Sequence, residues 1–352
     1  MGGDWIFNLR IEPLKEEYFN LAWERLNSLT KPKGSLGRLE ELAAQLVAIY
    51  ENPFPEIKRK LSFVFACDHG VAEEGVSAFP KEVTAQMVYN FLRGGAGINV
   101  LARHAGAEVR VVDVGVEKDL GNLPELINCK VCFGTKNFVK EQALEREEAI
   151  KSIEVGYELA KKALLEGFNL FGIGDMGIAN TTPSSAITAA ITGRPVEEVT
   201  GRGTGINDDF YRKKIEVIRR ALERHRPKPS DPIDVLSKVG GAEIGACAGV
   251  ILACAESKVP VVIDGFITGA GALIAYKINP LTKEYMIASH LSQERGHKAQ
   301  LEYMGLSPIL DLNLRLGEGT GAALAFLIIE AALKIYKEMA TFESANVSRE
   351  LI

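Results

Sequence analysis

The 352-residue chain lacks an excess of positive charge and any long apolar run that is free of acidic residues. Its formal net charge is −5, which argues against a nucleic-acid-binding surface. The two most apolar segments, residues 242–255 and 321–333, are too short for a membrane span and contain Glu243 and Glu330. We therefore expect both segments to form core helices, and we expect neither a nucleic acid nor a membrane as a partner.

The sequence also lacks the cysteine pattern of disulfide-rich or zinc-binding proteins. The five cysteines are odd in number, and Cys247 and Cys254 lie on a predicted helix of small residues, which fits core packing. Cys129 and Cys132 form a C-x-x-C pair in a predicted short strand, but no second pair follows at zinc-ligand spacing. Because residues 1–10 carry no signal-peptide pattern, we expect a reducing, cytoplasmic setting.

Histidines are few, and their spacing does not indicate a metal site. His290, Glu294 and His297 come nearest to one, but a separation of seven residues puts the two histidines two helical turns apart. We interpret these three as polar residues near a pocket and expect no bound metal. Asp68 and His69 follow a predicted strand as a catalytic pair or a turn, and a structural or pocket-lining role is favoured.

Apolar spacing predicts helices at the start of the chain and an alternating pattern after them. Leu39, Leu42 and Leu46 recur at helical spacing. From residue 61 onwards, short apolar runs end in small or polar residues and are mostly separated by helical segments, such as residues 147–165. The predicted strands are residues 61–67, 109–114, 170–173, 261–263, 285–288 and 309–312. This order predicts an α/β fold with a parallel sheet, whose ligand site lies beyond the carboxyl ends of the strands.

Residues 172–177 match the G-x-G-x-x-G pattern after a predicted strand, so a dinucleotide site must be considered. Two features argue against it. Asp175 would place a carboxylate inside the turn that holds the pyrophosphate, and no acidic residue closes a second strand about 20 residues later. We therefore disfavour a dehydrogenase.

Two later loops favour a phosphorylated ligand. Residues 180–186 put hydroxyl groups and backbone N–H groups at the start of a predicted helix, which suits one phosphate. Residues 201–205 form a second glycine-rich loop, with Lys213 and Lys214 downstream to supply positive charge. Each loop alone could be an ordinary helix cap. Because no Walker lysine is present, the pair does not indicate an ATPase.

Glu318 stands among three glycines, immediately before an apolar run at residues 322–329 that is typical of a buried helix. An acid at this place can cap the helix and be stabilised by the helix dipole. It can also act as a general base in a pocket. The spacing alone leaves both interpretations open.

Seven segments, in this order along the chain, closely resemble the nicotinate-nucleotide–dimethylbenzimidazole phosphoribosyltransferase family. They are residues 31–40 (KPKGSLGRLE), 68–84, 174–183 (GDMGIANTTP), 201–205 (GRGTG), 262–272, 289–298 (SHLSQERGHK) and 316–325 (LGEGTGAALA). The resemblance extends over residues 25–335, nearly the whole chain, which makes it far more specific than any single glycine loop.

The resemblance implies transfer of phosphoribose from nicotinate mononucleotide to 5,6-dimethylbenzimidazole. The products would be α-ribazole 5′-phosphate, the lower-ligand nucleotide of cobalamin, and nicotinate, with inversion at the anomeric carbon. The implied fold is a large Rossmann-like domain with helices on both faces of the sheet, residues 56–329. A small helical domain would come from residues 1–55 with 330–352. The resemblance also implies that the protein forms a homodimer. Because the pyridinium leaves as a neutral base, we expect no cofactor and no metal.

The resemblance also implies catalytic roles. Glu318 would remove the N–H proton of the benzimidazole while the other ring nitrogen attacks the ribose. Burial would raise the pKa of Glu318 and a helix N-terminus would lower it, and the sequence does not rank the two effects. Asp175 stands where many members carry glutamate, and it would stabilise positive charge on the sugar. Ala179 replaces a common family glycine, which is tolerable only if this residue does not need a positive φ.

The remaining implied roles concern binding. The expected nucleotide contacts are Gly174, Gly177, Asn180, Thr181, Gly203, Thr204 and Lys214, and the expected base pocket is Ser77, Phe79 and Gln86, with Phe79 as a stacking face. Two alternatives stay open: the same transfer to another base, such as adenine or a phenol, and a nucleotide-binding relative that has lost catalysis. The intact Glu318 segment argues against the second alternative, whereas the short Asp175 argues for it.

Overall fold

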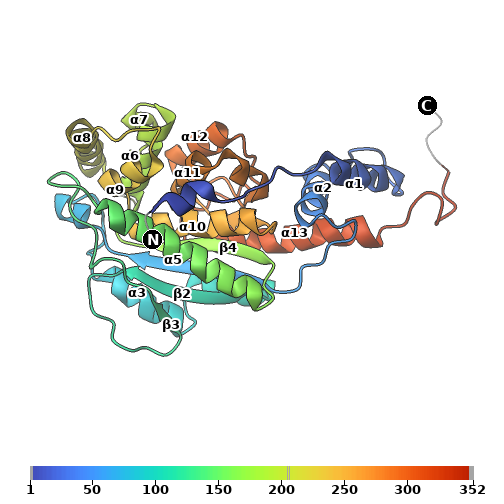
Figure 1. The fold of residues 1–352 in the computed structure, drawn as a ribbon, viewed down its shortest axis with the longest axis horizontal. Coiled ribbons are helices and arrows are strands. Elements are labelled where there is room, and N and C mark those ends of the chain that lie inside the picture. The colour runs from blue at the N-terminus through green and yellow to red at the C-terminus, as the bar shows by residue number, and fades with distance from the viewer. Residues whose placement is uncertain (1–2, 204, 206, 349–352) are drawn as a thin grey trace.

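The computed structural model of the chain describes residues 3–203, 205 and 207–348 (Figure 1). They form one parallel six-stranded sheet between layers of helices, which confirms the predicted α/β class with helices on both faces. The strands are β1 (Lys60–Cys67), β2 (Glu108–Gly115), β3 (Leu126–Asn128), β4 (Leu170–Met176), β5 (Val261–Ile263) and β6 (Met286–Ala288).

The strand order is β3-β2-β1-β4-β5-β6, with every neighbouring pair parallel. Phe65 in the centre of β1 pairs with Val112 of β2 on one side and with Asp175 of β4 on the other. The chain leaves β1 towards one edge of the sheet and returns at β4 towards the other. In such sheets the crevice outside the carboxyl ends of the strands at this switch point is the usual ligand site.

Two predicted strands differ from the structure. Residues 309–312 form no strand, because Leu310 makes a single bridge to His290 beyond the end of β6 and no ladder continues from it. The strand predicted around Cys129 and Cys132 lies earlier, as β3. The backbone N–H of Cys129 still donates to Asp113, so the chain continues beside β2 without a regular register.

Helices cover both faces of the sheet because the strand side chains alternate. Phe63 and Phe65 point into the core beneath α10 (Ala242–Glu256), whereas Val64 and Ala66 face a second core on the opposite side. With α10 on the first face lie α5 (Arg146–Leu165), α9 (Pro232–Val239) and α11 (Phe266–Ile278), and on the second face lie α3 (Val83–Leu92), α4 (Gly97–Ala105) and α13 (Thr320–Glu338). The other helical segments are η1 (Gly3–Asn8), α1 (Glu16–Ser28), α2 (Arg38–Tyr50), η2 (Gly70–Glu74), α6 (Thr181–Thr192), α7 (Val196–Val199), α8 (Asp208–His225), η3 (Pro280–Tyr285) and α12 (Arg295–Met304).

Both segments predicted as core helices are helical and largely buried. Fourteen residues of α10, from Ala242 to Ala255, are buried, and α13 buries Ala322, Ala323 and Phe326. Within the part of the chain that the structure describes, we find no helix with the length and apolarity that a bilayer crossing requires.

The helices α1 and α2 pack together against the C-terminal half of α13, away from the sheet (Figure 1). Arg25 of α1 donates to the carbonyl oxygens of Tyr336 and Lys337 near the end of α13. These contacts support the proposed small domain of residues 1–55 with 330–352. However, α13 passes residue 330 without a break, and Trp5 stacks edge-on against Tyr157 of α5. The domain boundary therefore stays a prediction.

The close approach of α5 and α10 generates a stability prediction. A Cβ at Gly156 would overlap the carbonyl oxygen of Ala246, which is backbone and cannot rotate away. Alanine is intrinsically better than glycine in a helix by about 1 kcal/mol, so Gly156→Ala would stabilise an isolated helix. In the folded protein we expect the overlap to reverse the sign and lower the free energy of unfolding by about 1–3 kcal/mol. Thermal and urea unfolding would measure this.

The matched control is Glu158→Ala on the exposed side of α5. We expect this change to stay within about 0.5 kcal/mol of the parent, as surface changes usually do. A Gly156→Ala variant as stable as the parent would contradict the close packing of the two helices.

Candidate active site

A cavity of about 600 Å³ opens at the carboxyl ends of the strands, on the β4–β6 side of the switch point. This volume lies within the usual range for small-molecule sites. Six segments of the chain, together with Val83 and Met87 of α3, line this cavity. They are Val76, Ser77 and Phe79; Asp175–Thr181; Gly203; Gly265–Ile267; His290, Ser292 and Glu294; and Asn313–Glu318.

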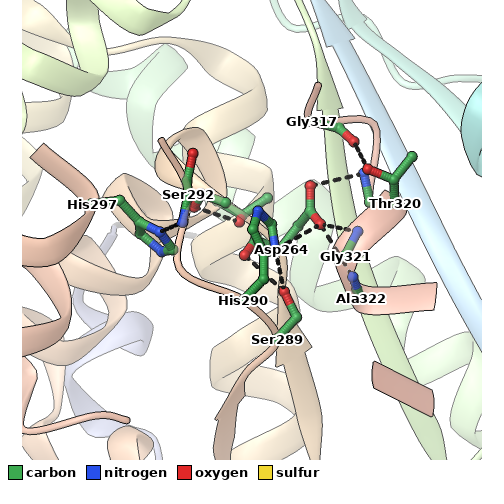
Figure 2. Close-up of polar contacts among 12 residues, drawn as sticks. Asp264, Ser289, His290, Ser292, His297, Gly317, Thr320, Gly321 and Ala322 are labelled. Carbon is green, nitrogen blue, oxygen red and sulfur yellow. Dashed lines mark hydrogen bonds and ion pairs between the residues drawn. The ribbon is translucent and has the colours of Figure 1, made fainter. Parts of the chain in front are cut away.

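Asp264, the residue after β5, holds the start of α13 (Figure 2). Its Oδ2 accepts from the N–H of Gly319 at 3.1 Å, and its Oδ1 accepts from Gly321 at 2.7 Å and from Ala322 at 3.1 Å. Burial raises the pKa of Asp264 to about 7, while the three N–H groups oppose this rise. The acid that caps α13 is therefore Asp264, a residue that the sequence analysis did not single out.

Glu318 does not cap α13, so the capping interpretation is wrong. Its Oε2 instead accepts from the N–H of Ile98 at 3.1 Å, at the start of α4, and the carboxylate lies against Gly97. The side chain lines the cavity and is 6% exposed. Burial raises the pKa of Glu318 above its ordinary value, and the N–H groups of Ile98 and Gly97 oppose the rise. Burial is thus the larger of the two effects that the sequence could not rank.

The backbone around Glu318 is left-handed at three successive residues. Gly317, Glu318 and Gly319 have φ of 83°, 63° and 93°. A non-glycine residue in this region carries strain of about 1–2 kcal/mol, which the surroundings must offset. The bonds from Gly319 and Gly321 to Asp264 hold this loop in place. The strained turn is what carries the Glu318 carboxylate into the cavity.

Asp175 lies near the end of β4 and lines the same cavity. Its Oδ2 accepts from Asn180 Nδ2 at 2.8 Å, and a Cβ on Gly317 would contact this oxygen at 3.4 Å. Burial raises the pKa of Asp175 well above its ordinary value; the charge of Asp264 adds to this, and the Asn180 hydrogen bond opposes it. The structure therefore brings Asp175 next to the loop of Glu318, as the proposed catalytic pair requires.

The turn after β4 needs a positive φ where this chain has alanine. Ala179 has φ of 75°, so the condition under which alanine would be tolerated here without strain is not met. Its carbonyl oxygen accepts from the N–H of Thr182, and the neighbouring Ile178 N–H donates to Thr84 Oγ1 at 3.1 Å. These bonds hold the turn that leads into α6, at the cost of the strain that a glycine would avoid.

The glycines of the G-x-G-x-x-G pattern serve the packing of the protein itself. A Cβ on Gly174 would overlap the carbonyl of Glu318, and one on Gly172 would lie 2.9 Å from Phe326 of α13. Gly177 lines the cavity, whereas Gly174 does not. Gly174 allows the Glu318 loop to approach β4, and its contact with the substrate stays a prediction.

The residues predicted to hold a phosphate gather at the start of α6. Lys214 Nζ donates to Thr181 Oγ1 at 2.6 Å, and a Cβ on Gly203 would lie 2.8 Å from this hydroxyl. Asn180, Thr181 and Gly203 line the cavity, while Lys214 is fully buried behind Thr181. Burial lowers the pKa of Lys214 to about 8, and the charge of Glu294 opposes this. Thr204, the remaining predicted contact, lies outside the described residues.

Glu294 and His290 line the cavity, in agreement with their interpretation as polar residues near a pocket, whereas His297 does not. The N–H of Gly203 donates to Glu294 Oε1 at 2.9 Å, so Glu294 holds Gly203 beside the cavity. His290 Nδ1 lies 2.8 Å from Ser289 Oγ, and burial lowers the pKa of His290 to about 4, so the ring is neutral at pH 7 (Figure 2). Both the spacing of the histidines and the resemblance of residues 289–298 pointed to this segment.

Two of the three residues predicted to form the base pocket line this cavity. Ser77 and Phe79 line the cavity, and Phe79 is 52% exposed, which leaves a ring face available for stacking. Gln86 does not line it. Val83 and Met87 of α3 line this cavity, whereas Gln86 lines a separate cavity of about 300 Å³, so its contact with the base stays a prediction.

Asp68 and His69 have different surroundings in the structure. Asp68 lines the second cavity beside Gln86, and its Oδ2 accepts from the N–H of Glu117 at 2.9 Å. Burial raises the pKa of Asp68. His69 is fully buried and lines neither of these two cavities. The structural role favoured for this pair fits their positions better than a catalytic one.

The cavity thus combines two chemical functions. One wall carries hydroxyl and N–H donors backed by a buried lysine, which suits a phosphate. The other carries a buried carboxylate of raised pKa, which suits removal of a proton from a nitrogen base. An apolar, partly aromatic surface at Phe79 and Met87 lies in the same cavity.

Comparison with known proteins agrees with this arrangement. The profile of a family described as phosphoribosyltransferase matches residues 11–347. Proteins named nicotinate-nucleotide–dimethylbenzimidazole phosphoribosyltransferase are similar to the chain: the one from Geotalea uraniireducens is 60% identical over 96% of both chains, and the one from Geobacter sulfurreducens is 57% identical over the same shares. The crystal structure of CobT from Thermus thermophilus superimposes with a TM-score of 0.92 at 48% identity, covering 95% of this chain and 100% of that one. The chain therefore belongs to the nicotinate-nucleotide–dimethylbenzimidazole phosphoribosyltransferase family.

Proposed function

We propose that the protein transfers phosphoribose from nicotinate mononucleotide to 5,6-dimethylbenzimidazole, giving α-ribazole 5′-phosphate and nicotinate with inversion. The observation that carries the proposal is the buried carboxylate of Glu318, with its raised pKa, in a cavity that also holds a phosphate-type site. A relative that carries the name of this activity is 60% identical over nearly the whole chain, which supports the same reaction here.

The phosphate of the donor would bind at Asn180, Thr181 and Gly203. Lys214 lies behind this wall with its Nζ on Thr181 Oγ1, so it supplies positive charge without entering the cavity. An anion at this place favours the charged lysine and raises its pKa from about 8. Thr204, from the same loop, would add a further contact.

The acceptor would stack on Phe79 beside Ser77. Its unprotonated ring nitrogen would face the ribose, and the N–H of its second ring nitrogen would face Glu318. Glu318 takes this proton as the other ring nitrogen forms a bond to the anomeric carbon. The bond from the anomeric carbon to the pyridinium nitrogen breaks, and its electron pair stays on the leaving nicotinate ring. Glu318 ends protonated and returns its proton to solvent. Attack from the face opposite the leaving group accounts for the inversion.

Asp175 would stabilise the positive charge that develops on the sugar. This role needs the ionised carboxylate, although burial raises its pKa. The cationic pyridinium of bound nicotinate mononucleotide favours the ionised form, because an opposite charge nearby lowers the pKa of a carboxyl group. Binding of the donor would therefore prepare Asp175 for its role.

We also propose that the protein works as a cytoplasmic homodimer. All five cysteines are free thiols, which suits a reducing compartment. Leu312 and Leu316 are exposed apolar side chains near the mouth of the cavity, which a second copy would cover. Light scattering of the purified protein measures the oligomeric state directly.

The proposed reaction predicts equal formation of nicotinate and α-ribazole 5′-phosphate from the two substrates. Chromatography of both products, with EDTA present to remove accessible magnesium, measures this. Release of nicotinate alone would indicate hydrolysis or a different acceptor, and assays with adenine and with other benzimidazoles would then identify the base. Binding of nicotinate mononucleotide without any turnover would contradict catalysis and leave a nucleotide-binding protein.

Replacement of the proposed base gives the second prediction. In Glu318→Gln the amide keeps the shape of the side chain but cannot accept the proton. We expect kcat to fall by about 10²–10⁴-fold, while the dissociation constant for nicotinate mononucleotide stays close to that of the parent. The control is Glu338→Gln, an exposed change at the end of α13, which should leave both constants unchanged. A Glu318→Gln enzyme with parental kcat would exclude Glu318 as the base.

The raised pKa of Glu318 also predicts a pH dependence. A general base must be ionised, so kcat/KM falls as the pH decreases through this pKa. We expect the acid limb to lie above the ordinary range of a glutamate, because burial disfavours the charged form. The pKa of the acceptor base is measured separately, and the pH profile of kcat/KM is corrected for the fraction of the acceptor that is protonated. If Asp175→Asn removed the limb while Glu318→Gln retained it, the limb would belong to Asp175 instead.

A further prediction concerns Asp175→Glu. Many family members carry glutamate here, so we expect activity equal to or higher than that of the parent if Asp175 has the usual role. Collapse of activity in this variant, with nucleotide binding retained, would mean that the pocket is built around the shorter acid and its bond to Asn180.

A further inference from the structure

A second group of chemically reactive side chains lies buried behind the active site. Cys67 ends β1, His69 follows it two residues later, and Glu243 lies in the first turn of α10. One ligand atom from each of these three residues lies within 4.8 Å of the others. All three side chains are fully buried. A thiol, an imidazole and a carboxylate that converge in this way are the ligand types that zinc prefers.

The polar atoms of this group are not satisfied by hydrogen bonds within the described residues. His69 Nε2 lies 2.8 Å from Glu243 Oε1, yet neither nitrogen of His69 and neither carboxylate oxygen of Glu243 has a partner in hydrogen-bonding geometry. Buried polar atoms without partners are rare in folded proteins because each costs free energy. Four such atoms on two adjacent buried side chains therefore point to something that binds there.

Cys132 adds a second sulfur to the group. The two sulfurs lie on the same side of Gly115, where an added Cβ would meet the sulfur of Cys67 at 2.6 Å and that of Cys132 at 3.0 Å. Another buried acid, Asp175, lies near enough for its charge to matter, since the charge of Glu243 raises the pKa of Asp175. A cation at this place would offset an accumulation of buried negative charge.

We propose that Cys67, His69 and Glu243 bind one Zn²⁺ ion, with Cys132 as the fourth ligand. Four protein ligands with no open position are typical of a structural zinc site. Each thiol transfers its proton to solvent as its sulfur binds the cation, which overcomes the burial that holds the pKa of Cys67 above its ordinary value.

The position of this site gives it a structural role. None of its four residues lines the catalytic cavity. However, a Cβ on Gly177 would overlap the carbonyl oxygen of Cys67 and lie 3.1 Å from His69 Nε2, so the cluster supports the turn that leads to Ala179 and Asn180 from behind. The zinc ion would join β1, α10 and the loop after β3, and it would touch neither substrate. Loss of zinc should therefore lower thermal stability, whereas loss of Glu318 should abolish transfer without changing zinc content.

The first test is the zinc content of the full-length protein, produced in zinc-supplemented medium and purified without chelators. We expect plasma mass spectrometry to find about one zinc ion per chain. Cys67→Ser and Cys132→Ser should each reduce this content severalfold and lower the melting temperature. Cys254→Ser is the matched control, because Cys254 is an equally buried cysteine on α10 outside the group. Equal zinc in all three variants would overturn the proposal and indicate adventitious binding.

The second test uses the unaltered protein, so it does not depend on the folding of any variant. We expect growth or refolding with Co²⁺ in place of zinc to produce the near-ultraviolet charge-transfer absorption of a cobalt–thiolate bond. Absence of both zinc and this absorption in the parent would overturn the proposal. A count of reactive thiols in the unfolded, zinc-free protein gives a further outcome. Three reactive thiols instead of five, with five recovered after addition of a reductant, would overturn the zinc proposal in favour of a Cys67–Cys132 disulfide.

Discussion

The hydrogen bonds from the start of α13 to Asp264 are the contact on which the active site depends. They join the end of β5 to the loop of Glu318, two segments more than fifty residues apart in the sequence. The loop has three successive left-handed residues, so it needs an external anchor to keep its conformation. Gly174 completes this anchor, because only a glycine lets the Glu318 carbonyl lie against β4. The position of the proposed base therefore depends on its contacts with β4 and with the end of β5, and not only on the helix that follows Glu318.

This anchor has an energetic consequence. Asp175, Asp264 and Glu318 are buried together, and burial raises the pKa of each. Ionising several neighbouring carboxylates in a low-dielectric interior costs free energy, which the packing of the sheet and its helices must offset. The same cost makes the group useful, since a carboxylate of raised pKa takes a proton from a nitrogen base more readily. The left-handed backbone at Ala179 also costs free energy, and it also serves the site, because this turn places Asn180 and Thr181 at the start of α6.

Much of the site was predictable because its residues lie in short continuous segments. Asp175, Asn180 and Thr181 occupy one turn, and Glu318 lies in a glycine-rich segment, so local patterns and the family resemblance located them. Gln86 lines the neighbouring cavity rather than the one beside Met87, and motif membership does not report which cavity a helix residue lines, so its contact with the base stays a prediction. Asp264 was missed because its role comes from contacts with α13, which no spacing within its own segment reveals.

The sequence by itself determined the α/β class, the parallel order of strand and helix, and the family to which the chain belongs, because these follow from periodicity and from motifs that are local in the chain. Tertiary structure alone decided which acid caps α13, which helix start binds the Glu318 carboxylate, and which glycines allow close packing of the backbone. It also decided that Cys67, His69 and Glu243, spread over more than 170 residues of sequence, lie together, with Cys132 beside Cys67. The physical reason is that burial, strain and charge interactions depend on which distant segments the sheet brings into contact, and these contacts exist only once the chain has folded.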